Sequence, residues 1–349
     1  MTMRFVGSGI RLGLALLALT LTGQETWAQA RTQVTLYTSI ETDQLAVFKQ
    51  AIEKELPDIE VRWVRDSTGV ITARVLAERE NPRADMIFGL AATSLLLFAA
   101  TDLLEPYKPK NIEEIKPAFR DSAALHRWTG MDAYVAAICF NRDEARRVGA
   151  PAPSRWRELL HPTLRQRIVM PHPASSGTGF LLVAGWIQMM GEEAAWAFME
   201  QLHDHVAIYT HSGSAPCVQS ARGERVVGLS FDMRGAREKS MGAPIDVIVP
   251  EDGAGWEMEA FALVRDRPVP QADAARRIAD WATSRRANEL YAQFYAVVAH
   301  RDVVNRPANY PPHAEERMLR NDFSWMAQNR ERILSEWSRR FDNRMPAPR

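Results

Sequence analysis

Between residues 33 and 100, short apolar strand patterns alternate with segments of helical periodicity. The strand patterns occupy 33–37, 59–64 and 85–89, and the helical segments that follow them occupy 42–56, 66–80 and 93–100. Strands that alternate with helices form a parallel sheet, because each helix carries the chain back to the same edge. This order predicts an α/β fold, in which ligands bind beyond the carboxyl ends of the strands.

The second half of the chain repeats this organisation. Further strand patterns occupy 168–170, 207–209, 226–231, 245–250 and 259–264, and helical patterns occupy 272–283, 286–295 and 327–340. An apolar run at 131–141 is long enough to cross from one lobe to another. About 320 residues can form one large unit or two lobes.

Residues 1–30 have the pattern of a cleaved signal peptide. Arg4 and Arg11 form a positively charged segment before an uncharged apolar run at 12–21. Ala28-Gln29-Ala30 has the small residues typical of a cleavage site. We expect a mature chain that begins near Arg31 and resides in the periplasm. An N-terminal membrane anchor is the alternative, but the apolar run is short for a bilayer.

Charge and cysteine content narrow the class further. Without residues 1–30 the chain has 41 basic and 42 acidic residues. This balance argues against nucleic acid or anionic membrane as a general partner. The two cysteines, Cys139 and Cys217, are compatible with one disulfide in an oxidising compartment and equally with two buried thiols.

Four hydroxyl-rich turns directly follow predicted strands. They are Thr38-Ser39, Ser67-Thr68-Gly69, Ser175-Ser176-Gly177-Thr178 and Ser212-Gly213-Ser214. Each turn alone is typical of a helix N-cap. Together, at the same edge of a sheet, they can direct hydroxyl groups, backbone N–H groups and helix N-termini at one small anion.

Carboxylates and aromatic rings could hold a cationic part of the same ligand. Glu41 and Asp232 follow predicted strands directly. Ring faces for a cation–π contact are available from Tyr37, Trp128, Tyr134, Tyr209 and Trp256. No Arg or Lys lies inside the hydroxyl turns, so we expect neutral donors to hold the anion and a zwitterion to be the preferred ligand.

Common catalytic signatures do not occur in the sequence. It contains no GxGxxG, GxxxxGK[ST], GxSxG or HExxH motif, and we expect neither an enzyme nor a cofactor or metal site. A secreted hydrolase with a loop serine as nucleophile stays open, because His172 and His211 lie near the serines in sequence.

The chain resembles the periplasmic solute-binding proteins of ABC importers, in the branch that includes ferric-iron, spermidine/putrescine and thiamine binders. Within that branch it is most similar to the 2-aminoethylphosphonate-binding proteins. The most specific stretches are WVRDSTGVITA at 63–73 and MPHPASSGTGF at 170–180, and the likeness extends over 33–341.

The resemblance implies a two-lobed, type II periplasmic binding protein. Each lobe would be a doubly wound, mainly parallel sheet with helices on both faces, and the ligand would lie in the interlobe cleft. We expect residues 31–135 plus 257–300 to form lobe I and residues 136–256 plus 301–349 to form lobe II.

The resemblance also implies that a monomer captures 2-aminoethylphosphonate by hinge closure and delivers it to a permease and its ATPase. The expected ligand-binding residues are Tyr37, Ser39, Glu41, Ser67, Thr68, Ser175, Ser176, Gly177, Thr178, Tyr209, Ser212 and Asp232. Phe231-Asp232-Met233 stands where iron-binding relatives have a tyrosine pair. Another phosphonate, a phosphate ester, a polyamine or a ferric complex are alternative ligands.

Overall fold

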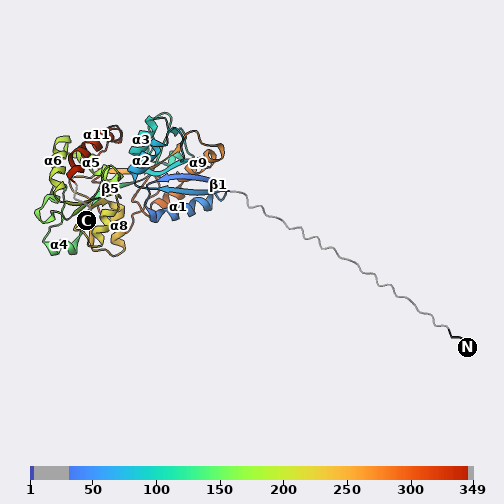
Figure 1. The fold of residues 1–349 in the computed structure, drawn as a ribbon, viewed down its shortest axis with the longest axis horizontal. Coiled ribbons are helices and arrows are strands. Elements are labelled where there is room, and N and C mark those ends of the chain that lie inside the picture. The colour runs from blue at the N-terminus through green and yellow to red at the C-terminus, as the bar shows by residue number, and fades with distance from the viewer. Residues whose placement is uncertain (4–30, 345–349) are drawn as a thin grey trace. The chain divides into compact units, whose positions relative to one another are not determined.

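A computed structural model of the chain describes residues 1–3 and 31–344 (Figure 1). The signal peptide expected at 1–30 therefore lies, except for its first three residues, outside the described part of the chain. The chain from Arg31 onward forms one compact unit.

The first part of this unit alternates strands and helices, as the sequence predicts. Its elements are β1 (Thr32–Thr38), α1 (Thr42–Glu55), β2 (Ile59–Arg65), α2 (Thr68–Ala77), β3 (Met86–Ala91) and α3 (Ala92–Ala100). Strand β1 pairs in parallel with both β2 and β3. The carboxyl ends of β1 and β2 consequently lie at the same edge of the sheet.

Two long strands connect the first part of the sheet to the second. They are β5 (Thr129–Asn141) and β10 (Trp256–Val264), which pair antiparallel with each other. Strand β10 also pairs with β3, and the second half of β5 pairs with β8 (Val227–Phe231). Every residue of β5 is buried, as expected for a strand at the centre of a sheet.

The second part again has parallel strands. Strand β6 (Ile168–Pro171) pairs in parallel with β7 (Val206–Thr210) and with β8, which gives the strand order β2-β1-β3-β10-β5-β8-β6-β7. Three shorter strands are not part of this order. Strand β4 (Leu104–Glu105) pairs with β10, and β9 (Ile245–Ile248) and β11 (Val297–Val298) pair with β5. The α/β class predicted from the sequence is confirmed, with a sheet of mixed strand direction.

Further helices cover the sheet (Figure 1). They are α4 (Arg142–Val148), α5 (Gly177–Met190), α6 (Glu192–His203), α7 (Ala215–Ala221), α8 (Asp232–Ser240), α9 (Val269–Ala282), α10 (Arg285–Tyr291) and α11 (Phe323–Phe341). Short 3₁₀ helices occupy Ile112–Glu114, Pro117–Phe119, Trp156–Leu160, Pro162–Leu164 and Asp342–Arg344. Leu36 and Tyr37, neighbours on β1, are buried in different apolar clusters, so the sheet is covered on both faces.

Cys139 of β5 and Cys217 of α7 form a disulfide, with their Cα atoms 5.3 Å apart. The bond joins a central strand to the helix that follows the Ser212–Ser214 turn. This settles the alternative that the sequence left open. In the described residues, no helix has the length and apolar character needed to cross a membrane.

Candidate functional site

A polar cavity with an empty volume of about 430 Å³ lies where the carboxyl ends of the parallel strands from both parts of the chain meet. Its walls are formed by Ser39, Glu41, Arg65, Ser67, Thr68, Tyr134, Ser176, Gly177, Thr178, Ser212, Gly213, Phe231 and Glu259. All four hydroxyl-rich turns predicted from the sequence contribute to it. These turns are separated by up to about 170 residues in the chain, and the fold brings them together.

The N-termini of α2 and α5 meet at this cavity. Ser67 is the N-cap residue of α2 and Ser176 is the N-cap residue of α5. The amide of Gly69 donates a 2.9 Å hydrogen bond to the carbonyl oxygen of Ser175. A Cβ atom on Gly177 would lie only 2.6 Å from Oγ1 of Thr68. Two positively polarised helix ends therefore converge on one small volume, which favours an anion there.

The hydroxyl groups differ in what they can still donate. Ser39 donates its proton to the carbonyl oxygen of Gly89 at 3.1 Å, so it is occupied. Ser176 accepts from the amide of Gly179 at 3.2 Å, which leaves its own proton for another acceptor. The side chain of Ser67 makes no capping bond to α2. Ser67 and Ser176, one from each part of the chain, are thus free to donate to an anion.

Arg65, the last residue of β2, also lines the cavity and was not among the predicted site residues. Among the described residues, its guanidinium hydrogen bond is from Nε to the carbonyl oxygen of Ile40, at 3.1 Å. The terminal nitrogens of the planar guanidinium group carry N–H donors that are well suited to binding an oxyanion. Arg65 adds a cation beside the neutral donors that the sequence led us to expect as the main donors.

Two carboxylates line the cavity with different surroundings. Oε2 of Glu41 lies 2.5 Å from a guanidinium nitrogen of Arg234, so Glu41 is already paired. Glu259 on β10 is 7% exposed, and its Oε2 has no hydrogen-bond partner among the described residues. Burial, together with the nearby Glu41 charge, raises the pKa of Glu259 to about 8. Sequence reasoning missed Glu259 because it sits inside a strand pattern.

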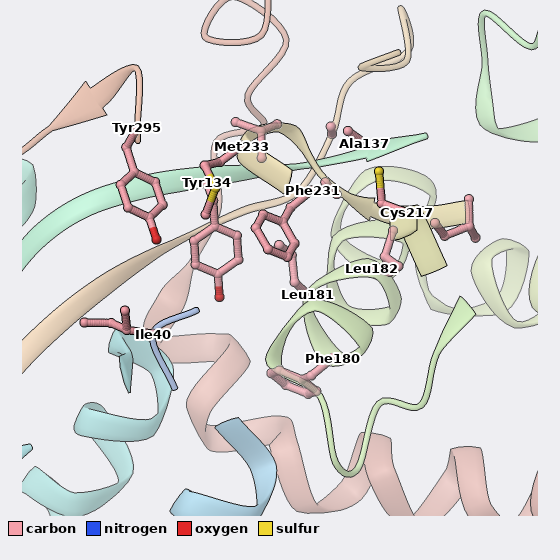
Figure 2. Close-up of a cluster of buried hydrophobic side chains, with 14 of the residues drawn as sticks. Ile40, Tyr134, Ala137, Phe180, Leu181, Leu182, Cys217, Phe231, Met233 and Tyr295 are labelled. Carbon is pink, nitrogen blue, oxygen red and sulfur yellow. The ribbon is translucent and has the colours of Figure 1, made fainter. Parts of the chain in front are cut away.

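Two aromatic rings complete the wall. The rings of Tyr134 and Phe231 are 5.4 Å apart and tilted against each other, and Tyr295 lies nearby (Figure 2). Tyr134 was one of the aromatic candidates for a cation contact. Phe231 presents a ring that has no atom able to ligate a metal.

Four of the predicted ligand-binding residues are not brought to the cavity wall, and two of these are tyrosines. The hydroxyl of Tyr37 donates to Glu78 at 2.8 Å, and Arg74 covers its ring at 4.9 Å, so this side chain is held under α2. Tyr209 stacks on His203 at 5.8 Å and accepts or donates a 3.0 Å hydrogen bond there. The hydroxyl groups of both tyrosines therefore hydrogen-bond to neighbouring side chains instead of facing the cavity.

The other two are Ser175 and Asp232. The hydroxyl of Ser175 donates to the carbonyl oxygen of His211 at 3.1 Å, away from the cavity. Asp232 is fully buried at the start of α8, where it accepts from the amide of Met233 at 2.7 Å and from the hydroxyl of Tyr310. Its carboxylate is therefore occupied by protein donors, which the sequence could not indicate because Tyr310 is far away in the chain.

The histidines considered for a hydrolase are paired with carboxylates. His172 lies 3.1 Å from Asp342, and His211 lies 3.0 Å from Asp66. The Ser175 hydroxyl contacts the backbone carbonyl oxygens of both histidines rather than their rings. In the described residues this arrangement offers no histidine base to a loop serine.

The sequence is similar to one protein family and to two individual bacterial proteins. Residues 81–326 match the family described as bacterial extracellular solute-binding protein. An uncharacterized protein of Haemophilus influenzae is 30% identical over 288 residues, which cover 80% of this chain and 82% of that protein. A probable ABC transporter periplasmic-binding protein of Sinorhizobium fredii, y4fP, is 22% identical over 247 residues, covering 68% of this chain and 66% of the relative.

Solved structures share the fold. The periplasmic binding protein AfuA from Actinobacillus pleuropneumoniae, with exogenous fructose-6-phosphate bound, is 25% identical with a TM-score of 0.83, covering 90% of this chain and 99% of AfuA. The periplasmic binding protein P5PA is 23% identical with a TM-score of 0.81, covering 89% and 99%. Iron-bound HitA from Pseudomonas aeruginosa is 16% identical with a TM-score of 0.73, covering 87% and 99%. The expected two-lobed type II fold is confirmed.

Proposed function

The chain belongs to the bacterial extracellular solute-binding protein family, and from this premise we propose that it captures 2-aminoethylphosphonate for an ABC importer. The observation that carries the proposal is the meeting of the α2 and α5 N-termini at one cavity that also contains the buried Glu259 carboxylate, whose Oε2 has no hydrogen-bond partner among the described residues. A zwitterion with a tetrahedral oxyanion at one end and an ammonium group at the other fits both features.

The phosphonate group would lie between the two helix starts. Ser67 and Ser176 have hydroxyl protons to donate, the amides at the start of each helix supply further donors, and Arg65 supplies a positive charge. Charge-assisted hydrogen bonds of this kind contribute about 1.5–3 kcal/mol each. Donors from both parts of the chain are needed to surround a tetrahedral group, so ligand binding favours the closed arrangement.

The amine would lie near the carboxylates. Glu259 and Glu41 both line the cavity, and Tyr134 offers a ring face beside them. A ligand with about 1.5 kcal/mol available from each of its seven non-hydrogen atoms can reach a binding free energy of about 10 kcal/mol. A binding free energy of about 12 kcal/mol corresponds to a Kd of about 1 nM, so about 10 kcal/mol corresponds to a Kd of tens of nanomolar. The ligand reaches this affinity only if nearly all of its polar atoms are hydrogen-bonded.

Closure would bring together lobe I (31–135 plus 257–300) and lobe II (136–256 plus 301–349). Contacts between these proposed lobes include the 2.5 Å ion pair of Arg234 with Glu41 and the 3.0 Å contact of His211 with Asp66. The long strands β5 and β10 would serve as the hinge, because β10 pairs with β3 of the first part, β5 pairs with β8 of the second part, and the two long strands pair with each other.

The protein would act as a monomer outside the cytoplasm, after cleavage of the signal peptide proposed for residues 1–30, and would present its closed form to a permease and its ATPase. The family and the probable periplasmic-binding relative y4fP support an extracytoplasmic transport role. The role is binding rather than catalysis, in agreement with the family.

A thermal-shift panel tests the proposal. The mature protein would be heated with 2-aminoethylphosphonate, inorganic phosphate, fructose 6-phosphate, a polyamine and ferric citrate. Only a ligand that binds the native state raises the Tm, and at 100 times its Kd it stabilises by about 2.7 kcal/mol. We expect the largest rise with 2-aminoethylphosphonate. A larger rise with ferric citrate or the polyamine, and none with the phosphonate, would overturn the proposal.

A sugar phosphate is the second candidate. AfuA, which has fructose-6-phosphate bound, is 25% identical to this chain over 90% of its length. A phosphate ester would occupy the same oxyanion position, and the carboxylates would then accept from sugar hydroxyls instead of an ammonium group. The fructose 6-phosphate arm of the same panel distinguishes the two.

A further inference from the structure

Two buried carboxylates lie on opposed residues of neighbouring strands, and one of them, Glu259, lines the cavity. Glu259 of β10 and Asp132 of β5 are directly opposed residues of an antiparallel pair. Asp132 is fully buried, and neither of its carboxylate oxygens has a hydrogen-bond partner among the described residues. Like charges directly opposite each other on neighbouring strands repel, and an unpaired charge is costly to bury. The pair therefore cannot hold two negative charges without a cation.

The charged and titratable groups around Glu259 do not supply that cation. Glu41 adds a further negative charge and is itself paired with Arg234. Arg65 lowers the pKa of Glu259 but does not offset the effect of burial. Tyr134, Tyr291 and Tyr295 face the carboxylate pair from β5, α10 and the turn after α10, and the pKa of each is raised by burial and by these acids. All three tyrosines are neutral, and a hydrogen bond from the Tyr295 hydroxyl to the Glu259 carboxyl group lowers the pKa of Glu259 without offsetting the effect of burial.

The empty pair consequently keeps a proton at neutral pH. Burial and the Glu259 charge raise the pKa of Asp132 well above its ordinary value. The pKa of Glu259 is raised to about 8, so about nine-tenths of these side chains are protonated at pH 7. A protonated carboxyl group can accept only weakly from an ammonium group and cannot form an ion pair with it.

We infer that Glu259 is the residue that selects ligands with a protonated amine, and that binding such a ligand expels the proton held by the Glu259–Asp132 pair. The inference rests on the proposed function and adds a selectivity residue and a proton-coupled step to it. The O–H bond of the carboxyl group breaks, the proton passes to the buffer, and an N–H group of the ligand donates to the ionised oxygen. No electrons are transferred.

Glu259 is better suited to this role than the other acids nearby. Glu41 is held by Arg234, and Asp232 accepts from Tyr310 and Met233. Oε2 of Glu259 is buried, belongs to the cavity wall and has no hydrogen-bond partner in the part of the chain that the structure describes.

The first test compares 2-aminoethylphosphonate with ethylphosphonate, which lacks the amine, by titration calorimetry. We expect wild-type protein to bind the aminated ligand at least about ten-fold more tightly, consistent with one charge-assisted contact. Glu259→Gln should lose most of this preference while its affinity for ethylphosphonate is unchanged or improved. If Glu259→Gln keeps the full preference, the inference is wrong.

Glu257→Gln is the matched control. Glu257 is also buried on β10, but it accepts from Thr93 at 2.6 Å and from the amide of Met258 at 3.0 Å and does not line the cavity. We expect this variant to keep the wild-type preference for the amine. A loss as large as that of Glu259→Gln would mean that any buried acid of β10 matters, and would overturn a specific role for Glu259.

Proton release is measured on the wild-type protein, so it does not depend on a variant that folds. The binding enthalpy at pH 7 is compared in buffers of different ionisation enthalpy, and the titration of each free ligand corrects for the ionisation of its own phosphonate group. We expect close to one proton released per 2-aminoethylphosphonate, and affinity that rises about ten-fold from pH 7 to pH 9. No net release overturns the inference. Absence of binding by either phosphonate would instead overturn the proposed function.

Discussion

The backbone amide of Gly69 and the carbonyl oxygen of Ser175 are joined by a 2.9 Å hydrogen bond. The bond links the first turn of α2 to the loop that starts α5, although the two residues are more than 100 positions apart. A Cβ atom on Gly69 would lie 2.0 Å from the carbonyl oxygen of Ala174, so only glycine allows this approach. The two helix starts are thereby held at one cavity.

The neighbouring serines of the α5 loop should differ in their contribution to binding. Ser176→Ala removes a hydroxyl that lines the cavity and has a free proton, so 2-aminoethylphosphonate affinity should fall at least about ten-fold. Loss of the N-cap should also lower stability by about 1 kcal/mol. Ser175→Ala removes a hydroxyl directed at His211 and should change the Kd less than about two-fold. Equal effects in calorimetry would contradict this assignment.

Arg234 should stabilise the protein more than its neighbour Arg237. The Arg234 side chain is 9% exposed and lies close to Glu41, Asp43 and Glu238. Arg234→Met leaves Glu41 and Glu238 without their cation, and we expect a loss of about 3 kcal/mol in the free energy of unfolding.

Arg237 provides the comparison for urea unfolding. Its side chain is 37% exposed and lies 2.6 Å from Asp43. Because solvent screens this pair, Arg237→Met should cost about 1 kcal/mol or less. The prediction fails if the two variants unfold at the same urea concentration.

The stability of the empty protein should fall as pH rises from about 5 to about 8. In this window Glu259 is ionised in the unfolded chain, where its pKa is ordinary, but keeps its proton in the folded state, where its pKa is about 8. The folded state therefore binds more protons, and stability declines with pH by up to about 1.4 kcal/mol per pH unit for this group.

Glu259→Gln should remove this contribution. Glu257 and Asp232, whose pKa values are raised by burial to about 7 and about 6, add slopes of the same sign and remain in the variant. The difference between wild type and Glu259→Gln in urea unfolding across the pH series reports the contribution of the Glu259–Asp132 pair. A difference that does not grow with pH would show that Glu259 is ionised in the empty protein.

The Cys139–Cys217 disulfide should contribute substantially to stability. The two cysteines are 78 residues apart in sequence, and a closed loop of that length restricts the unfolded chain by about 4 kcal/mol in the chain-entropy account. The double variant Cys139→Ala, Cys217→Ala should unfold at a clearly lower urea concentration while retaining ligand binding, because neither residue lines the cavity. An unchanged midpoint would contradict the expectation.

Most helices and strands were predictable from sequence because their apolar periodicity is regular. The run at 131–141 corresponds to β5 (Thr129–Asn141), and the hydroxyl turns fall at strand ends as expected. Glu259 escaped prediction because β10 changes register between Glu259 and Ala260, and such a bulge redirects side chains in a way that a two-residue period cannot show. Arg65 escaped because it ends a strand instead of opening a turn.

Residues beyond the strand ends were harder to assign, because their partners come from distant segments. Asp232 follows β8 directly, as a ligand-binding residue would, yet its carboxylate accepts from Tyr310, 78 residues further along the chain. Tyr209 lies near the carboxyl end of β7, but its ring packs against Trp337 of α11, with ring centroids 5.6 Å apart. Sequence position locates the edge of the sheet, whereas tertiary contacts decide which side chains are free.

Titration calorimetry of the mature protein with 2-aminoethylphosphonate and with inorganic phosphate tests the central claim most directly. The cavity has donors for a tetrahedral oxyanion and an unpaired carboxylate for an amine, so we predict a Kd of tens of nanomolar for the aminophosphonate and binding of phosphate at least about 100-fold weaker. Equal affinity for the two, or no heat with the aminophosphonate at millimolar concentration, would contradict it.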